Sequence, residues 1–104
     1  MELLNARALI TGGSEGIGFG IAKALVARGT KVAIMARDEH KVRLAAAELG
    51  VMAIVGDVSR ETDAQAAVQD FVDAFGGIDL LVNNAGFGYF APLVDLKKEE
   101  FEAV

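Results

Sequence analysis

The feature that most constrains the fold is an alternation of short, largely apolar runs with longer stretches of helical periodicity. The short runs are residues 8–10, 31–36, 51–55 and 78–82, which suit strands and are too short for helices. The stretches between them carry apolar residues three and four positions apart, and they end at Gly29, Gly50 and Gly76. Strands without a polar face, separated by helices, predict a parallel sheet covered on both sides.

The helical stretches also predict which side chains face the sheet. Ile17, Ile21 and Leu25 recur every four residues and predict one buried stripe on the first helix. Asp38 is the predicted N-cap of the second helix. The inner face of that helix is expected to be Val42, Ala45, Ala46 and Leu49. The third helix has the clearest amphipathic pattern, formed by Ala64, Ala67, Val68, Phe71, Val72 and Phe75. A last helix is expected from Asp95.

Right-handed crossovers between parallel strands leave few topologies for this element order. The natural one is a nucleotide-binding βαβαβ unit followed by a further helix and strand. We therefore predict the fold class α/β, a Rossmann-type doubly wound parallel sheet with strand order 3-2-1-4. Because such sheets normally continue past a fourth strand, we expect this domain to be truncated.

Composition excludes several classes of function. The chain of 104 residues has no cysteine and one histidine, so thiolate and histidine-rich metal sites are excluded. Its net charge of −5 argues against a nucleic-acid partner. Residues 1–52 carry +2 and residues 53–104 carry −7, so a phosphate-bearing ligand is expected to meet the first half. Neither a signal peptide nor a membrane-spanning run is recognisable, which predicts a cytoplasmic protein with no membrane contact.

The run Thr11-Gly12-Gly13-Ser14-Glu15-Gly16-Ile17-Gly18 lies between the first strand and the first helix. Glycines let the backbone turn sharply and approach a ligand, and a helix N-terminus presents free N–H groups to an anion. The hydroxyl of Ser14 adds a donor. The run therefore favours a phosphate cradle, although a glycine turn that only packs helix on strand has the same composition.

Three motifs together resemble the classical short-chain dehydrogenase/reductase family. They are Thr11-Gly12-x-x-x-Gly16-x-Gly18, Asp57-Val58 after the third strand, and Asn83-Asn84-Ala85-Gly86 after the fourth. The resemblance implies that residues 1–104 form an NAD(P)-binding Rossmann-type domain, incomplete at the C-terminus.

The resemblance also implies roles for individual residues. Near the cofactor's phosphates and the entry towards nicotinamide it places Gly12, Ser14, Gly16, Ile17 and Gly18. It gives Asp57 a hydrogen bond from the adenine amino group, places the backbone of Val58 beside the ring, and brings Asn84, Ala85 and Gly86 near the adenosine ribose. Two residues also have purely structural interpretations: Asp57 as the cap of the following turn, and Asn83 as part of the architecture.

The end of the second strand distinguishes NADP from NAD. An acidic residue there binds the free ribose hydroxyls of NAD, whereas a basic residue accommodates a 2′-phosphate. Here Ala36 stands at the position of the acid, and Arg37 follows it. We therefore predict NADP as the preferred cofactor, with NAD possible. Glu15 opposes this prediction, because its carboxylate would repel the phosphate unless it pairs with Arg37.

The family's catalytic groups, a serine and a Tyr-x-x-x-Lys pair, have no counterpart in this chain. Tyr89 is its one tyrosine, and Leu93 stands four residues later. We therefore assign no catalytic residue. The expected function is that of an NADP-preferring oxidoreductase that transfers a hydride between nicotinamide and a carbonyl or alcohol substrate, with this chain supplying only the cofactor-binding half. A homo-oligomer is expected.

Two other functions remain open at this point. A non-catalytic nucleotide-binding module would need only the motifs that are present. An S-adenosylmethionine-dependent methyltransferase is suggested by Glu15-Gly16-Ile17-Gly18-Phe19-Gly20, which resembles its cofactor loop. Against the methyltransferase, Thr11–Ser14 separate this loop from its strand, and no acid ends the second strand.

Overall fold

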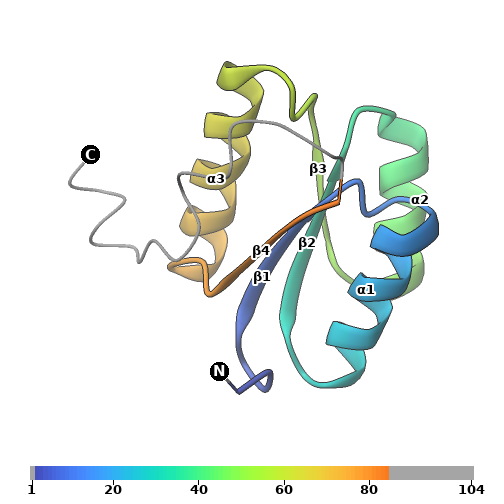
Figure 1. Cartoon of the computed structure of the whole chain (residues 1–104), viewed down its shortest axis with the longest axis vertical. Coiled ribbons are helices and arrows are strands. Elements are labelled where there is room, and N and C mark those ends of the chain that lie inside the picture. Colours follow the sequence, from blue (N-terminus) through green and yellow to red (C-terminus); the bar gives the residue numbers. More distant parts are fainter. Residues whose placement is uncertain (1, 85–104) are drawn as a thin grey trace.

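A computed structural model describes residues 2–84 of the chain. Four strands alternate with three helices in this part (Figure 1). The strands are β1 (Arg7–Thr11), β2 (Lys31–Ala36), β3 (Met52–Val55) and β4 (Leu80–Asn83), and the helices are α1 (Gly16–Ala27), α2 (Glu39–Leu49) and α3 (Glu61–Phe75). All strand pairs are parallel, and the order β3-β2-β1-β4 confirms the predicted topology. The helix expected from Asp95 lies outside the described residues.

The sheet is the middle layer of three, with α1 and α2 on one face and α3 on the other (Figure 1). Successive residues of a strand point to opposite faces. Ile10 of β1 therefore packs with the α1 and α2 side, whereas Leu9 packs with Phe71 on the α3 side. All three side chains are fully buried. Burying each one contributes about 1.5–3 kcal/mol, so both faces of the sheet stabilise the fold.

The helix ends agree with the sequence-based predictions. A side-chain oxygen of Asp38 accepts a hydrogen bond from the backbone N–H of Lys41 at 3.0 Å, so Asp38 is the N-cap of α2. Gly50 and Gly76 end α2 and α3 with φ of 71° and 88°. This left-handed conformation is one that glycine adopts without a steric penalty.

The predicted stripe on α1 is wrong at Ile17, whose side chain is 74% exposed. The buried residues of α1 are Gly18, Ala22 and Leu25. Consecutive helical residues differ by 100° in direction, so a contact through Gly18 turns Ile17 away from the sheet. The predicted inner faces of α2 and α3 are confirmed, with Leu49 and Phe75 half-buried at their edges.

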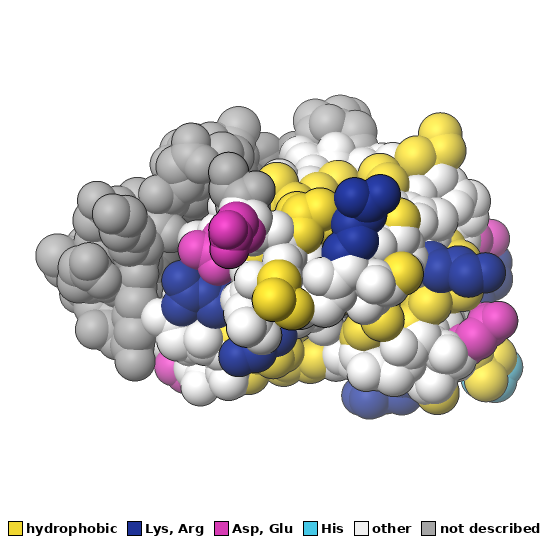
Figure 2. Space-filling view, turned by 90° about the horizontal axis from the view of Figure 1, so that it is seen from below, with side chains coloured by type: hydrophobic (Ala, Val, Ile, Leu, Met, Phe, Trp, Pro, Cys, Tyr) yellow, Lys and Arg dark blue, Asp and Glu magenta, His cyan; other side chains and the backbone are white. Residues whose placement is uncertain are grey.

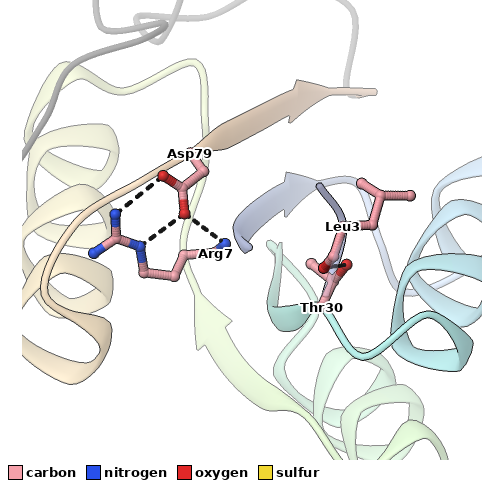
Figure 3. Close-up of polar contacts among 4 residues, drawn as sticks. All are labelled: Leu3, Arg7, Thr30 and Asp79. Carbon is pink, nitrogen blue, oxygen red and sulfur yellow. Dashed lines mark hydrogen bonds and ion pairs between the residues drawn. The ribbon is translucent and has the colours of Figure 1, made fainter. Parts of the chain in front are cut away.

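β4 begins two residues later than predicted because Ile78 and Asp79 form the connection that enters it. Figure 3 shows the Asp79 carboxylate beside the side chain and backbone N–H of Arg7. Figure 3 also shows the Thr30 hydroxyl, which donates to the Leu3 carbonyl at 2.7 Å. These contacts hold the amino ends of the strands together.

Figure 2 views the molecule from this end of the sheet, where Lys, Arg, Asp and Glu side chains are interspersed with hydrophobic ones. No single charge sign dominates the part of this face that is described. None of the helices within residues 2–84 is long and apolar enough to cross a membrane.

Candidate nucleotide-binding site

A cleft of about 790 Å³ lies at the carboxyl ends of β1, β2 and β3. In a parallel sheet the loops that follow the strands meet at this edge, and ligands of doubly wound folds bind there. Its lining comes from the last residues of β1 and β2, the loops after the three strands and the first turn of α2: Thr11, Gly12, Ser14, Glu15, Met35, Ala36, Arg37, Asp38, Lys41, Gly56, Asp57, Val58 and Ser59.

The glycine turn is shaped by close backbone contacts. Gly12 has φ of 70°, and its N–H donates to the Met35 carbonyl at 2.8 Å. A Cβ atom on Gly18 would lie 2.1 Å from the Gly12 carbonyl oxygen, so only glycine lets α1 start this close to the turn. The N-cap residue Glu15 forms no side-chain cap hydrogen bond, which leaves the first N–H groups of α1 available to an anion.

The turn is also tied to the end of β4. The Thr11 hydroxyl donates to Oδ1 of Asn83 at 2.9 Å, which supports the architectural interpretation of Asn83. The side-chain amide of Asn84 donates to the Gly12 carbonyl at 3.4 Å. Asn84 therefore lies against the glycine turn, although it does not line the cleft.

Five charged side chains line the cleft, and three of them are carboxylates that already have a partner. Asp38 caps α2, and Asp57 accepts hydrogen bonds from the backbone N–H and hydroxyl of Ser59 at 2.9 and 2.6 Å. The Glu15 carboxylate pairs with Lys41 at 3.6 Å and not with Arg37. Within residues 2–84, Arg37 forms no ion pair.

The hydrogen bonds at Asp57 affect its ionisation. The Ser59 hydroxyl and then the Ser59 N–H hold the pKa of the Asp57 carboxyl below its ordinary value, and the charges of Arg37 and Arg60 act in the same direction. Desolvation opposes them. Asp57 therefore caps the following turn, which is the structural role that the sequence suggested for it. It also lines the cleft as an anion, so the contact with an adenine amino group stays a prediction.

The structure brings together six of the candidate cofactor-site residues singled out in the sequence. The cleft is lined by Gly12, Ser14, Glu15, Arg37, Asp57 and Val58. Gly16, Ile17, Gly18 and Asn84 are described but do not line it. Ala85 and Gly86 lie outside the described residues.

Sequence reasoning did not place two charged residues at the cleft: Asp38, predicted only as the N-cap of α2, and Lys41. Lys41 lies in the first turn of α2, three residues after the N-cap Asp38. A signal was present in the sequence, because the amino end of α2 follows the carboxyl end of β2 directly. The Lys41 side chain reaches the loop that follows β1, where its ammonium lies 3.6 Å from the Glu15 carboxylate.

Comparison with known proteins identifies the family. A family model described as short chain dehydrogenase matches residues 6–104. The chain belongs to the short-chain dehydrogenase family. Galactitol 2-dehydrogenase of Agrobacterium fabrum is 41% identical over 106 residues, which cover 100% of this chain and 41% of that protein.

Solved structures of the family have the same fold. The 3-ketoacyl-(acyl-carrier-protein) reductase of Brucella melitensis, complexed with NADH, matches with a TM-score of 0.78 and 40% identity over 98% of this chain and 43% of its own. The C-domain of a bacterial malonyl-CoA reductase with NADP matches with a TM-score of 0.78 and 37% identity over 83% of this chain and 15% of its own.

The resemblance found in the motifs is thus confirmed, and the family match decides against the methyltransferase. The chain spans about two fifths of the length of the curated short-chain dehydrogenases it matches.

Proposed function

We propose that this chain is the cofactor-binding portion of a short-chain oxidoreductase that uses a nicotinamide cofactor and prefers NADP. When bound, the nicotinamide would exchange a hydride with a carbonyl or alcohol substrate. Support comes from membership in the family and from similar structures crystallised with NADH or NADP. Those relatives differ in the substrates that their names give, so the substrate is proposed only as a chemical class.

The described residues fit such a cofactor. The cleft volume of about 790 Å³ lies within the range of about 300–1,000 Å³ usual for small-molecule sites. The hydroxyl of Ser14 and the uncapped N–H groups at the start of α1 would hold the phosphates. Asp57 and Val58, on the opposite loop, would hold the adenine. These residues bind and orient the cofactor, and none of them supplies acid–base chemistry to a substrate.

The preference for NADP depends on one observation: Arg37 lines the cleft and forms no ion pair within residues 2–84. A guanidinium binds phosphate through paired donors and a permanent charge. Ala36, the last residue of β2, offers no carboxylate to the ribose hydroxyls. The cleft lining as a whole contains three carboxylates against two cations, so the preference must come from local contact with Arg37 and not from a general positive potential.

Replacing Arg37 by Asp tests this assignment. The variant removes the phosphate partner and supplies a carboxylate for the ribose hydroxyls, so we expect the ratio of NADPH to NADH affinity to fall at least tenfold. Equilibrium binding measured by the fluorescence of the reduced cofactors gives this ratio directly. Arg28→Asp is the matched control, because it makes the same change of charge at the other end of α1.

An unchanged affinity ratio in Arg37→Asp would contradict the role of Arg37. Binding of neither cofactor to the unmodified protein would contradict the proposed function itself.

A non-catalytic nucleotide-binding module remains the second candidate. The observation that favours it is that every role assigned to the described cleft residues is one of cofactor binding. Cofactor binding is common to both candidates, so it does not separate them. Oxidation of NADPH by the full-length protein in the presence of a panel of carbonyl compounds does: turnover supports the oxidoreductase, and binding without turnover supports the module.

A further inference from the structure

The ion pair between Lys41 and Glu15 lies in the cleft but is not one of the contacts assigned to the cofactor above. The Lys41 ammonium lies 3.6 Å from the Glu15 carboxylate, with side chains 56% and 72% exposed, respectively. The two residues come from different elements, the first turn of α2 and the residue before α1, and both line the cleft. The pair therefore joins the glycine turn to the first turn of α2, which directly follows the loop that carries Arg37.

We infer that Lys41 is a positioning residue for cofactor specificity: by neutralising Glu15 it leaves Arg37 available to a phosphate on the adenosine ribose. This inference rests on the proposed function and assigns the Lys41–Glu15 ion pair a part in the preference for NADP. Arg37 supplies the contact with the phosphate, but an unpaired Glu15 in the same cleft would compete with the phosphate for the guanidinium.

Lys41 affects phosphate binding because it is one of only two cations among the described residues that line the cleft. Three carboxylates and two cations line it, so the loss of Lys41 raises the excess of negative charge from one to two. Asp38 and Asp57 are held by the N–H groups and hydroxyl of their own turns. Glu15 has no such hydrogen bond, so within the described cleft its partner is Lys41. Glu15 is thus the carboxylate whose orientation Lys41 controls.

The pair is solvent-exposed, which limits the size of the effect. Exposed ion pairs in proteins are worth about 0.2–1 kcal/mol, which corresponds to at most about fivefold in an equilibrium constant. A 2′-phosphate carries more than one negative charge and would meet the uncompensated Glu15 as well. We therefore expect a loss of about two- to fivefold for a ribose-phosphorylated ligand and less than twofold for the unphosphorylated one.

The test compares adenosine 2′,5′-bisphosphate with adenosine 5′-monophosphate by titration calorimetry on the full-length protein. Lys41→Gln should weaken binding of the bisphosphate selectively, and Glu15→Gln should strengthen it. In the double variant, the effect of Lys41→Gln should disappear, because no carboxylate remains to be neutralised. Arg43→Gln is the matched control, since it removes a positive charge from the same helix. Arg43 pairs with Glu39 at 2.9 Å and not with Glu15.

Three results would overturn the inference. Equal losses for the two ligands in Lys41→Gln would mean that Lys41 does not act on the phosphate. A loss that persists in the double variant would make Lys41 a direct phosphate ligand. A loss of affinity of the same size and selectivity in Arg43→Gln would mean that the net charge of the protein, and not the pairing of Lys41 with Glu15, explains the effect. If neither ligand binds the unmodified protein, the proposed function is contradicted. If both ligands bind and the ratio of their affinities is the same in Lys41→Gln, only the inference is contradicted.

Discussion

At the scale of single residues, the contact between Arg7 and Asp79 is the best-defined polar interaction of the fold. The carboxylate accepts from the Arg7 backbone N–H at 2.9 Å and from two guanidinium nitrogens at 2.8 and 3.0 Å. Charge-assisted, bidentate geometry of this kind is stronger than an ordinary surface ion pair. The contact joins residues 72 positions apart at the point where β1 and the connection into β4 begin.

This contact predicts a pH dependence of stability. The hydrogen bond from the Arg7 side chain is the main reason why the pKa of Asp79 lies below its ordinary value of 3.8, against the effect of burial. A lowered pKa in the folded state stabilises the fold above the unfolded-state value, and this stabilisation is lost as the pH falls through the folded value. We expect Asp79→Asn to lower the free energy of unfolding by about 1–3 kcal/mol at pH 7 and by much less near pH 2.

Urea denaturation at both pH values measures the difference. Asp70→Asn, an exposed position on α3, is the control and should change little at either pH. A destabilisation by Asp79→Asn that is independent of pH would contradict this account.

At the scale of elements, two glycines of α1 are expected to respond to alanine in opposite directions. A Cβ on Gly18 would lie 2.1 Å from the Gly12 carbonyl oxygen, and this backbone cannot move without opening the turn. Gly18→Ala should therefore lower the free energy of unfolding by about 1–3 kcal/mol. Gly20, on the exposed side of the same helix, has nothing within 4 Å, so Gly20→Ala should raise it by about 0.5–1 kcal/mol.

The two variants together separate packing from helix propensity, because both make the same chemical change in one helix. Urea denaturation midpoints of the two proteins give the comparison. Stabilisation by both substitutions would show that the contact of Gly18 with Gly12 does not constrain the turn.

At the scale of the whole molecule, the described part of the sheet has two edge strands, β3 and β4. β1 and β2 have neighbours on both sides, whereas β4 is an edge strand within residues 2–84, and its four residues are half-buried. An apolar edge strand offers unpaired backbone groups to a neighbouring chain. A chain of about this size also buries only about two thirds of its surface.

We propose that β4 needs a neighbouring strand, either from the same protein or from a second copy. Residues 1–104 produced alone should therefore show a low free energy of unfolding or associate with a concentration-dependent mass. Sedimentation velocity over a range of concentrations, together with thermal unfolding, measures both. A stable monomer would contradict this proposal.

Most of the fold was predictable because it is encoded locally. The apolar runs, the N-cap Asp38 and the glycines that end α2 and α3 act within a few residues of the chain, and crossover handedness supplies the strand order. The exposure of Ile17 was not predictable, because the face that α1 buries depends on how closely Gly18 approaches Gly12. Periodicity alone does not contain that contact.

The sequence by itself determined the element types, their order, the family and six of the thirteen residues that line the cleft, because motifs that follow parallel strands converge at one edge of the sheet. Only the tertiary structure decided which charges pair there. The sequence suggested Arg37 as the partner of Glu15, but the packing of α2 beside the glycine turn brings Lys41 to its carboxylate instead. Side-chain pairing between elements depends on distances in space that spacing along the chain does not specify.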